Sequence, residues 1–216
     1  MDSIPFAFCD AVIGTIKKLP WVYVPFPDAK WNKALQDHIA NRKCFALNIG
    51  FSDHKWSYRL FNTEFNSKTD IPILLELVGP KYLRINYIEV SEGRTATETS
   101  NEEIHVLIKR LKPFLNFPAL YLYDANSKIL GSDLDQLLLA FAKINICLLY
   151  SACRAPSVTE FAKQLMQQDT LVKEITIQDA EDVLAVAIVD YRATGRVVHV
   201  KTDFVPVNGT SLLFVR

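Results

Sequence analysis

Hydrophobic and polar positions follow a repeated order over the second half of the chain. An amphipathic stretch with helical spacing, a turn and a short apolar run occur together four times from residue 102 onward. Apolar residues at the spacing of one helix face predict helices, and short apolar runs bounded by turn residues predict buried strands. The predicted helices are Glu102–Leu111, Asp133–Ala142, Val158–Gln168 and Ala180–Ala193. The predicted strands centre on Leu120–Leu122, Ile146–Leu148, Ile175–Ile177 and Val198–Val200.

Helix-start signals agree with this pattern. Ser100 and Glu103 have the spacing of a capping box, and Ser157 and Glu160 repeat it. A helix–strand unit of roughly 20–29 residues is typical of a leucine-rich-repeat horseshoe, because each unit buries its apolar face against its neighbours. We therefore predict an α/β fold of leucine-rich-repeat-like units. A sandwich with a doubly wound parallel sheet stays open as the alternative, and differs in having helices on both faces of the sheet.

The N-terminal part of the chain predicts two helices. Apolar residues recur four apart near the start, which predicts a short helix with Asp2 or Ser3 as its cap. After a proline-rich segment, Asp28 is expected to cap a second helix that runs to about Ala40. The apolar residues of the first helix are Ile4, Phe8, Val12 and Ile16, and those of the second are Trp31, Ala34, Leu35 and Ile39. We predict a helical segment over residues 1–42 and a repeat region over 43–216.

From residue 43 the apolar period changes to two, which predicts strands. Phe45 to Phe51 and Trp56 to Leu60 form two alternating runs around a turn at residues 52–54, as in a β-hairpin. Ile73–Val78 and Tyr82–Val90 predict two more strands. In the latter, Leu83, Ile85 and Tyr87 are expected on one face and Arg84, Asn86 and Ile88 on the other. Residues 91–100 predict an exposed loop, and the tail 204–216 predicts an edge strand.

Composition restricts the class of partner. Lys+Arg and Asp+Glu number 24 each, so the chain lacks the basic excess of a general nucleic-acid binder. It has no run of 18 apolar residues for a membrane span and no basic start for a signal peptide. The four cysteines lie in apolar surroundings, as reduced buried thiols do. We expect an intracellular protein, cytoplasmic or nuclear, that binds neither nucleic acid nor membrane.

No motif for catalysis, phosphate binding or metal binding is present. The histidines are scattered, at positions 38, 54, 105 and 199, without the spacing that brings metal ligands together. We therefore predict no catalytic residue, no metal and no cofactor. A small α/β enzyme is the alternative, with a pocket around Cys153, Arg154 and Asp124. Cys153 is its candidate nucleophile, because a neighbouring arginine favours a thiolate, and it competes with an inert apolar thiol.

Two tyrosines indicate a binding surface. Tyr121 and Tyr123 flank Leu122 and therefore point away from the apolar face of their predicted strand. In a horseshoe that side is the concave surface, which commonly binds a protein partner. The corresponding positions on later strands are Tyr150, Thr176, Gln178, His199 and Lys201. This prediction depends on the register, because a shift by one residue reverses every facing.

The start of the chain also carries a family resemblance. Ile4–Val12, followed by Ile16 and Leu19 and by Trp31 on the second helix, resembles a divergent F-box. The units after Ser100 are similar to the degenerate leucine-rich or F-box-associated region of the F-box-related proteins of nematodes. The resemblance implies a substrate receptor of an SCF-type ubiquitin ligase. It implies that the cullin adaptor binds Ile4, Pro5, Phe8, Val12 and Ile16, and that the repeat region binds a target protein.

Other interpretations of the same features stay open. The first helix is equally compatible with capping the core of a repeat array, which every array requires. A binding or inhibitory protein that masks another protein, like an antidote, would need the same surfaces and no adaptor. The interaction interpretation predicts an exposed apolar patch on the first helix of the isolated chain.

Overall fold

The computed structural model describes residues 4–16, 25–52, 55–62, 68–69, 81–93, 97–123, 131–153, 155–167, 172, 174–177 and 199–201. Its helices are α1 (Phe6–Thr15), α2 (Ala29–Asn41), α4 (Asn101–Leu111), α5 (Gly131–Phe141) and α6 (Pro156–Gln167), with a 3-10 turn η1 (Lys112–Phe114). Its strands are β1 (Lys43–Ser52), β2 (Lys55–Asn62), β3 (Lys68–Thr69), β4 (Leu83–Glu92), β5 (Thr97–Thr99), β6 (Leu115–Tyr123), β7 (Leu148–Ser151), β8 (Glu174–Ile177) and β9 (His199–Lys201). The predicted α/β class is confirmed.

All described strands belong to one mixed sheet. The order is β3-β2-β1-β4-β6-β7-β8-β9, with β5 paired to β2. The predicted hairpin is present, because β1 and β2 pair antiparallel around residues 53–54. Along the part of this order that runs β1-β4-β6-β7-β8-β9, every pairing is parallel, and each new strand adds to the same edge of the sheet. Parallel neighbours need a crossover connection, and α4, α5 and α6 occupy three of these connections.

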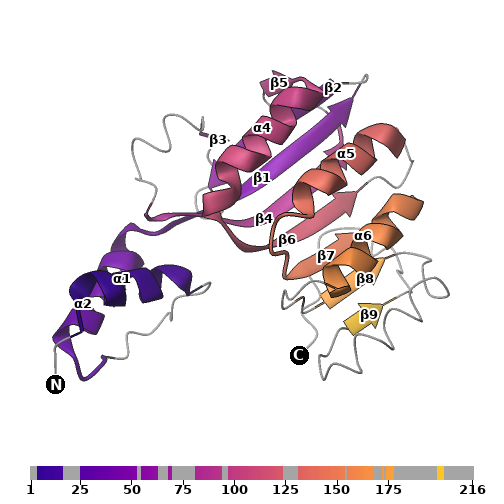
Figure 1. The fold of residues 1–216 in the computed structure, drawn as a ribbon. Coiled ribbons are helices and arrows are strands. Elements are labelled where there is room, and N and C mark those ends of the chain that lie inside the picture. Colours follow the sequence, from indigo (N-terminus) through magenta and orange to yellow (C-terminus); the bar gives the residue numbers. More distant parts are fainter. Residues whose placement is uncertain are drawn as a thin grey trace, which may run out of the picture.

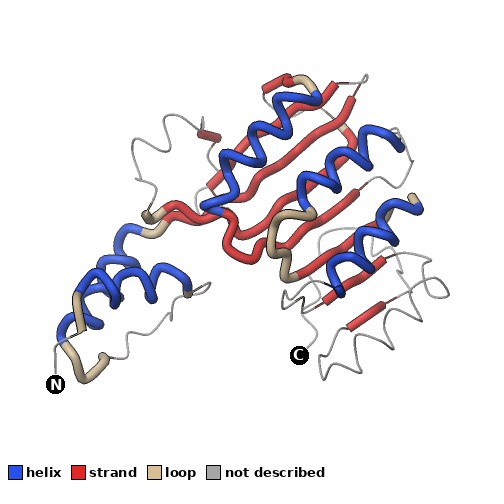
Figure 2. The backbone as a smooth tube through the Cα atoms, viewed as in Figure 1, coloured by secondary structure: helices blue, strands red, loops and turns tan. Residues whose placement is uncertain are grey.

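Helices α4, α5 and α6 lie side by side on one face of the sheet (Figures 1 and 2). Each helix is followed by the next parallel strand, so the three units α4–β6, α5–β7 and α6–β8 repeat one arrangement. Among the described helices after residue 100, all cover this one face, which is the arrangement expected for a horseshoe. The predicted helix 180–193 and the strand Ile73–Val78 lie outside the described residues, as does the tail 204–216.

The main core lies between the sheet and these helices. Alternate residues of the strands point to it, for example Ile49 of β1, Val90 of β4 and Leu120 of β6, and all three are fully buried. Phe141 of α5 and Leu165 of α6 pack on them from the helix side. The opposite face of the same strands is therefore the face without α4, α5 and α6.

A β-bulge overturns one predicted facing. β4 shifts register between Ile85 and Tyr87 against both β1 and β6. Against β1, Asn86 is the extra residue, so Ile88 joins Ile85 in the core and Tyr87 turns to the opposite face. The prediction that Tyr87 shares a face with Ile85 is wrong, because strict alternation does not allow for an extra residue in a strand.

Three predicted boundaries also differ. β7 starts two residues later than predicted, since the amide of Cys147 donates to the carbonyl of Pro118 before the ladder begins. The expected loop 91–100 contains the short strand β5. The second capping box is wrong, because α6 begins at Pro156 and places Ser157 inside its first turn. Proline suits this first helical position, since its φ is preset for the helix.

The first two helices form a pair beside the sheet (Figure 1). α1 and α2 pack on each other through Cys9, Ile13, Ala34 and Leu35, a cluster separate from the main core. Asp28 caps α2 as predicted and accepts hydrogen bonds from the amides of Lys30 and Trp31. The predicted cap of α1 is wrong, because Pro5 is at its N-cap and makes no side-chain hydrogen bond. In the described part of the chain, no helix is long and apolar enough to cross a membrane.

Candidate functional site

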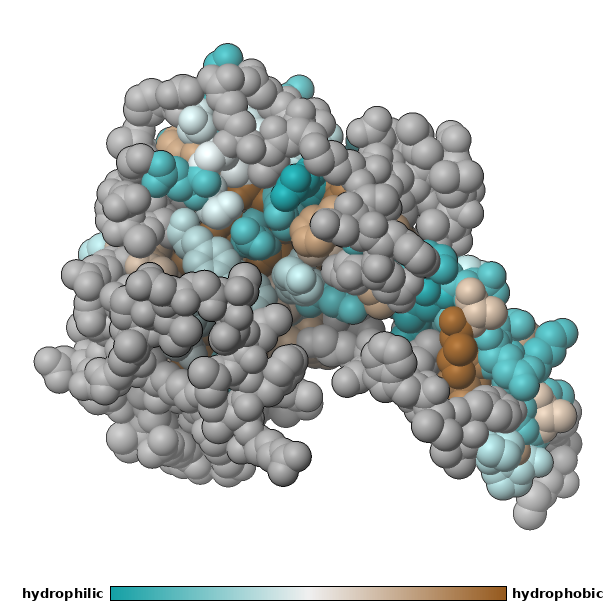
Figure 3. All heavy atoms as spheres, turned by 180° about the vertical axis from the view of Figure 1, so that it is seen from behind, coloured by the Kyte–Doolittle hydropathy of each residue, from teal (hydrophilic) through white to brown (hydrophobic). Residues whose placement is uncertain are grey.

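The first candidate surface is an apolar patch on the helical pair. Phe8 and Ile4 keep 53% and 44% of their surface exposed, and Phe26 before α2 is also exposed. Both phenylalanine rings contact Trp31 of α2, with centroids 6.1 Å away for Phe8 and 5.9 Å for Phe26. We call Ile4, Phe8, Phe26 and Trp31 the N-terminal patch. Figure 3 shows hydrophobic surface on this pair among hydrophilic residues.

The predicted adaptor residues divide between this patch and the core of the pair. Ile4, Pro5 and Phe8 are exposed, and Val12 is half-buried. Ile16 packs against the small core of the pair. The residues that anchor α1 are Cys9 and Ile13, which the four-residue spacing did not select. Two different apolar faces thus share α1, one buried against α2 and one exposed.

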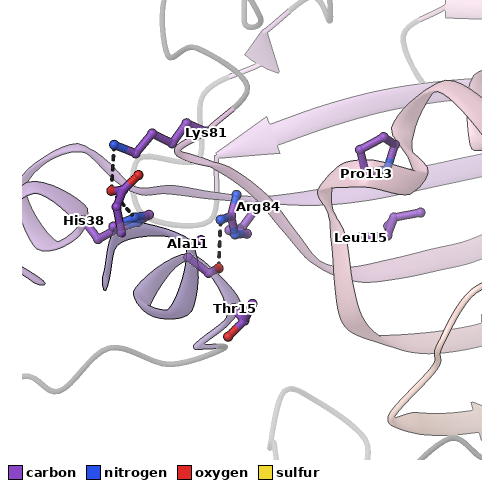
Figure 4. Close-up of a pocket in the computed structure, with 9 residues that line it drawn as sticks. Ala11, Thr15, His38, Lys81, Arg84, Pro113 and Leu115 are labelled. Carbon is purple, nitrogen blue, oxygen red and sulfur yellow. Dashed lines mark hydrogen bonds and ion pairs between the residues drawn. The ribbon is translucent and has the colours of Figure 1, made fainter. Parts of the chain in front are cut away.

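Charged residues connect the helical pair to the sheet (Figure 4). Arg42, between α2 and β1, donates to the carbonyls of Ile13 and Ile16 at the end of α1. Arg84 of β4 donates to the carbonyl of Gly14 at 2.9 Å. The last carbonyls of a helix have no partner within it, so these guanidinium groups satisfy them and also offset the helix dipole. A cavity of about 390 Å³ lies beside these contacts.

His38 is fully buried in this junction. Its Nε2 lies 3.3 Å from a carboxylate oxygen of Asp10, which also pairs with Lys81 at 2.7 Å. Burial lowers the pKa of His38, the positive charge of Arg42 lowers it further, and Asp10 opposes both. The neutral imidazole is therefore the form that the junction favours. His38 is thus a structural residue at this position, where Asp10 of α1 and Lys81 next to β4 meet.

The second candidate surface is on the face of the sheet opposite α4, α5 and α6 (Figure 1). Tyr121 lies at the centre, with its ring centroid 5.8 Å from Tyr87, 6.0 Å from Tyr123 and 6.0 Å from Tyr150. Tyr123 and Tyr150 are 5.5 Å apart. The four rings come from β4, β6 and β7, and we call them the tyrosine surface. Figure 3 views this face, where pale and hydrophilic residues lie over the central strands.

The register places polar residues in one line with the tyrosines. Glu89 is paired with Tyr121 on one side and with Asn48 on the other, and Asn48 is paired with Arg59. On the far side, Tyr121 is followed by Tyr150 and then by Thr176 and Lys201. The pairing thus brings residues from seven strands into one row across the sheet.

The polar end of this row is incompletely satisfied. The Oδ1 of Asn48 and the Nε of Arg59 are buried, yet neither finds a hydrogen-bond partner in the described part of the chain. Asn48 keeps only 7% of its surface exposed. A buried polar atom without a partner costs about 1–3 kcal/mol, so a group that bonds to it from outside recovers free energy. This end of the row is suited to hydrogen bonding with a bound molecule.

Burial affects the acid–base behaviour of this face. It raises the pKa of Glu89, which the nearby charge of Arg59 only partly offsets. It raises the pKa of Tyr123 to about 12, with Tyr150 adding to the effect. Burial is also the main cause that raises the pKa values of Tyr87, Tyr121 and Tyr150. At neutral pH the four phenols are protonated, so each carries an O–H group that donates rather than an anionic oxygen.

The structure brings together some of the predicted partner residues. Tyr121, Tyr123 and Tyr150 are in mutual contact, and Thr176 is next in the same row. Lys201 pairs with Thr176 and His199 with Glu174 through their backbones, while Gln178 lies outside the described residues. Sequence reasoning missed Tyr87, Glu89 and Asn48 as members of this surface. Cross-strand pairing identifies them, and that pairing depends on the register and on the bulge in β4.

The alternative catalytic residue does not reach the surface. Cys153 is buried in the main core, where its amide donates to the hydroxyl of Ser151 at 3.0 Å. Arg154 and Asp124 lie outside the described residues, as does His54. No cluster of three or more His, Cys, Asp or Glu residues that could hold a metal ion occurs among the described positions.

Comparison of the chain with protein-family models, curated proteins and solved structures returns no match.

Proposed function

We propose that this protein is a protein-interaction module that acts as the substrate receptor of an SCF-type ubiquitin ligase inside the cell. The observation that supports this proposal best is the exposed N-terminal patch. Phe8 on α1 and Ile4 just before it are apolar and exposed, although α1 is held by a buried core of its own. An exposed apolar cluster of this kind is typical of a docking surface for another protein.

The adaptor contact uses the exposed face of α1. An apolar helix face that enters a groove is a common mode of recognition, with anchor residues three or four positions apart. On α1, Phe8 and Val12 have this spacing. Ile4 lies just before the helix, and Trp31 supports Phe8 from α2. Large aromatic side chains contribute most to such contacts, so Phe8 is the expected anchor of the adaptor interface.

The target contact uses the tyrosine surface. Tyrosine is enriched where proteins bind each other, because a rigid ring offers a large contact area and a hydroxyl group. A target that donates to Asn48 and accepts from Arg59 would also satisfy the two buried atoms at the end of the row. The chain itself breaks and forms no bond in this proposal. It raises the effective concentration of the target beside the ubiquitin-charged enzyme.

Binding to a cullin adaptor tests the first half of the proposal. The purified chain is compared with Phe8→Asp in a pull-down, after circular dichroism has shown that both fold. Because Phe8 is exposed, the aspartate costs little stability but disrupts an apolar interface. We expect at least a tenfold loss of adaptor binding.

The matched control is Val106→Asp on α4, where the side chain is 55% exposed. It introduces the same charge at similar exposure on another surface and should bind like wild type. Absence of adaptor binding by the folded wild type would remove the ligase assignment. The tyrosine surface would then belong to a binding or inhibitory protein without an adaptor.

A separate experiment tests the target surface. Proteins crosslinked to the wild-type chain in cells are compared with those crosslinked to the Tyr121→Ser variant. We expect the variant to lose its target while it still binds the adaptor, because Tyr121 is at the centre of the ring contacts. The same set of crosslinked proteins for both would contradict the assignment of this face.

A further inference from the structure

A groove between α4 and α5 combines an apolar floor with lysines, and it is part of neither proposed binding surface. It encloses about 540 Å³ on the helix side of the molecule, opposite the tyrosine surface. Its floor includes Ile108 and Ile144, which are both buried. Leu139 on its edge is 64% exposed, the largest exposed fraction of any large apolar side chain described.

Three lysines surround this apolar floor. Lys109 of α4, Lys112 of η1 and Lys143 after α5 line the groove together with His105. None of the residues that line it is acidic, and none of the ion pairs among the described residues involves these lysines. The whole chain has equal numbers of acidic and basic residues, so this positive cluster is a local feature.

The fold explains why these charges meet. α4 and α5 each precede a parallel strand of the same sheet, so they run in the same direction and their C-terminal ends are neighbours. Lys109 is in the last turn of α4, where its charge also offsets the helix dipole. That role would not require an exposed leucine and an apolar floor between the lysines.

We propose that the groove between α4 and α5 binds an acidic segment of a partner protein, with one apolar side chain on Leu139 and carboxylates beside Lys109, Lys112 and Lys143. Charge complementarity supports this occupant, because an acidic segment gains three ammonium partners and meets no carboxylate in the lining. The exposed Leu139 and the buried floor supply the apolar anchor site. The site is independent of both surfaces in the proposed ligase function.

Selection from a random peptide library tests the proposal. A phage library of random peptides of about twelve residues is panned against the full chain. The selected peptides are then measured on the double variant Lys109→Glu, Lys143→Glu, in which both altered side chains are exposed. We expect the retained peptides to carry two or more carboxylates around one large apolar residue. Their affinity should fall at least tenfold on the double variant and also with rising salt.

Two further variants separate the groove from overall charge. Lys33→Glu with Lys163→Glu changes the net charge of the chain equally on other surfaces and should leave peptide affinity unchanged. Leu139→Ala should weaken binding without altering charge. Peptides that are neutral or basic, peptides that bind the charge-reversed variant equally well, or no selected peptide at all would overturn the proposal. Binding of oleate in place of any peptide would assign the groove to a fatty acid and would also overturn the proposal.

Discussion

Single side chains at the junction decide how the helical pair is attached. His38 is buried among charged groups from the elements around it. They are Asp10 on α1, Arg42 before β1, Lys81 before β4 and Arg84 on β4. Burial and the three nearby cations outweigh the carboxylate of Asp10, so the junction favours the neutral form of His38. The junction is therefore sensitive to acid at one position.

The folded protein is expected to lose stability below pH 6.5 because of His38. Its pKa in the folded state is lowered from 6.5, so the unfolded chain takes up this proton first as the pH falls. The contribution is complete above about pH 6.5 and decreases below it, by at most about 1.4 kcal/mol per pH unit for one proton. Chemical denaturation at pH 7.5 and 5.5 measures it. His38→Gln should show a smaller loss than wild type, and equal losses would contradict the assignment.

Ser100 is a second position where one side chain sets local stability. Its hydroxyl accepts from the amide of Glu103 at 3.2 Å, and the carboxylate of Glu103 accepts from the amide of Ser100 at 2.9 Å. These bonds lower the pKa of Glu103, so the cap is complete above about pH 4.5 and weakens as the pH falls below it. Ser100→Ala should reduce the free energy of unfolding by about 1 kcal/mol.

Ser157→Ala is the matched control for this change. Ser157 is inside the first turn of α6 and caps nothing, so its loss should alter stability by less than about 0.5 kcal/mol. A larger effect at Ser157 than at Ser100 would show that the capping box at α4 has been misassigned. Thermal unfolding of the three proteins in parallel gives the comparison.

At the scale of elements, the bulge in β4 positions the tyrosine surface. Before Asn86 the core residues are Leu83 and Ile85, and after it they are Ile88 and Val90. The extra residue changes the alternation once, so Tyr87 turns toward Tyr121 on β6. Without this bulge the sequence pattern would place Tyr87 in the core and remove one of the four rings.

Deletion of Asn86 is expected to be tolerated. The shortened strand alternates regularly, with Ile85, Ile88 and Val90 still facing the core and Tyr87 still facing outward. We expect cooperative unfolding and a loss of no more than about 2 kcal/mol, because only the local bend disappears. Circular dichroism and urea denaturation measure both quantities.

Deletion of Asn48 from β1 is the opposing case. It would reverse the facing of Ile49 and Phe51. Each of these side chains, on leaving the core, lowers the free energy of unfolding by about 1.5–3 kcal/mol. That loss approaches the total stability of a typical domain, so this variant should not fold. A folded Asn48 deletion together with an unfolded Asn86 deletion would refute the register given for β1 and β4.

At the scale of the whole molecule, two apolar clusters are connected by charged contacts. The pair α1–α2 has its own small core, and the main core lies under α4, α5 and α6. Hydrogen bonds from Arg42 and Arg84 to the end of α1 link the two. The adaptor surface in our proposal therefore belongs to one cluster and the target surface to the other.

Replacement of Arg84 by methionine should loosen the pair without unfolding the sheet. The variant keeps an apolar side chain of similar length but loses the charged hydrogen bond to Gly14. Such a bond contributes about 1.5–3 kcal/mol, so amides of α1 and α2 should exchange with solvent roughly tenfold faster or more. Mass-spectrometric hydrogen exchange should show β1 and β4 unchanged. Lys33→Met on the exposed side of α2 is the control. Faster exchange throughout the chain in both variants would contradict the claim that Arg84 acts locally on the helical pair.

The sequence by itself determined the elements and their class. Periods of three to four and of two distinguish the helices of the second half from the hairpin β1–β2, because burial of one face imposes these spacings. The caps at Asp28 and Ser100 are local, since a side chain bonds to amides two or three residues away. For the same reason, Tyr121, Tyr123 and Tyr150 were identified from alternation within their own short strands.

Only the tertiary structure decided which residues meet. The bulge at Asn86 depends on pairing with β1, and the row from Arg59 to Lys201 depends on the register of seven strands. On α1, the spacing offers two apolar faces, and only the position of α2 selects Cys9 and Ile13 for burial and leaves Phe8 exposed. Contacts between distant segments depend on how whole elements pack, and no local pattern encodes that packing.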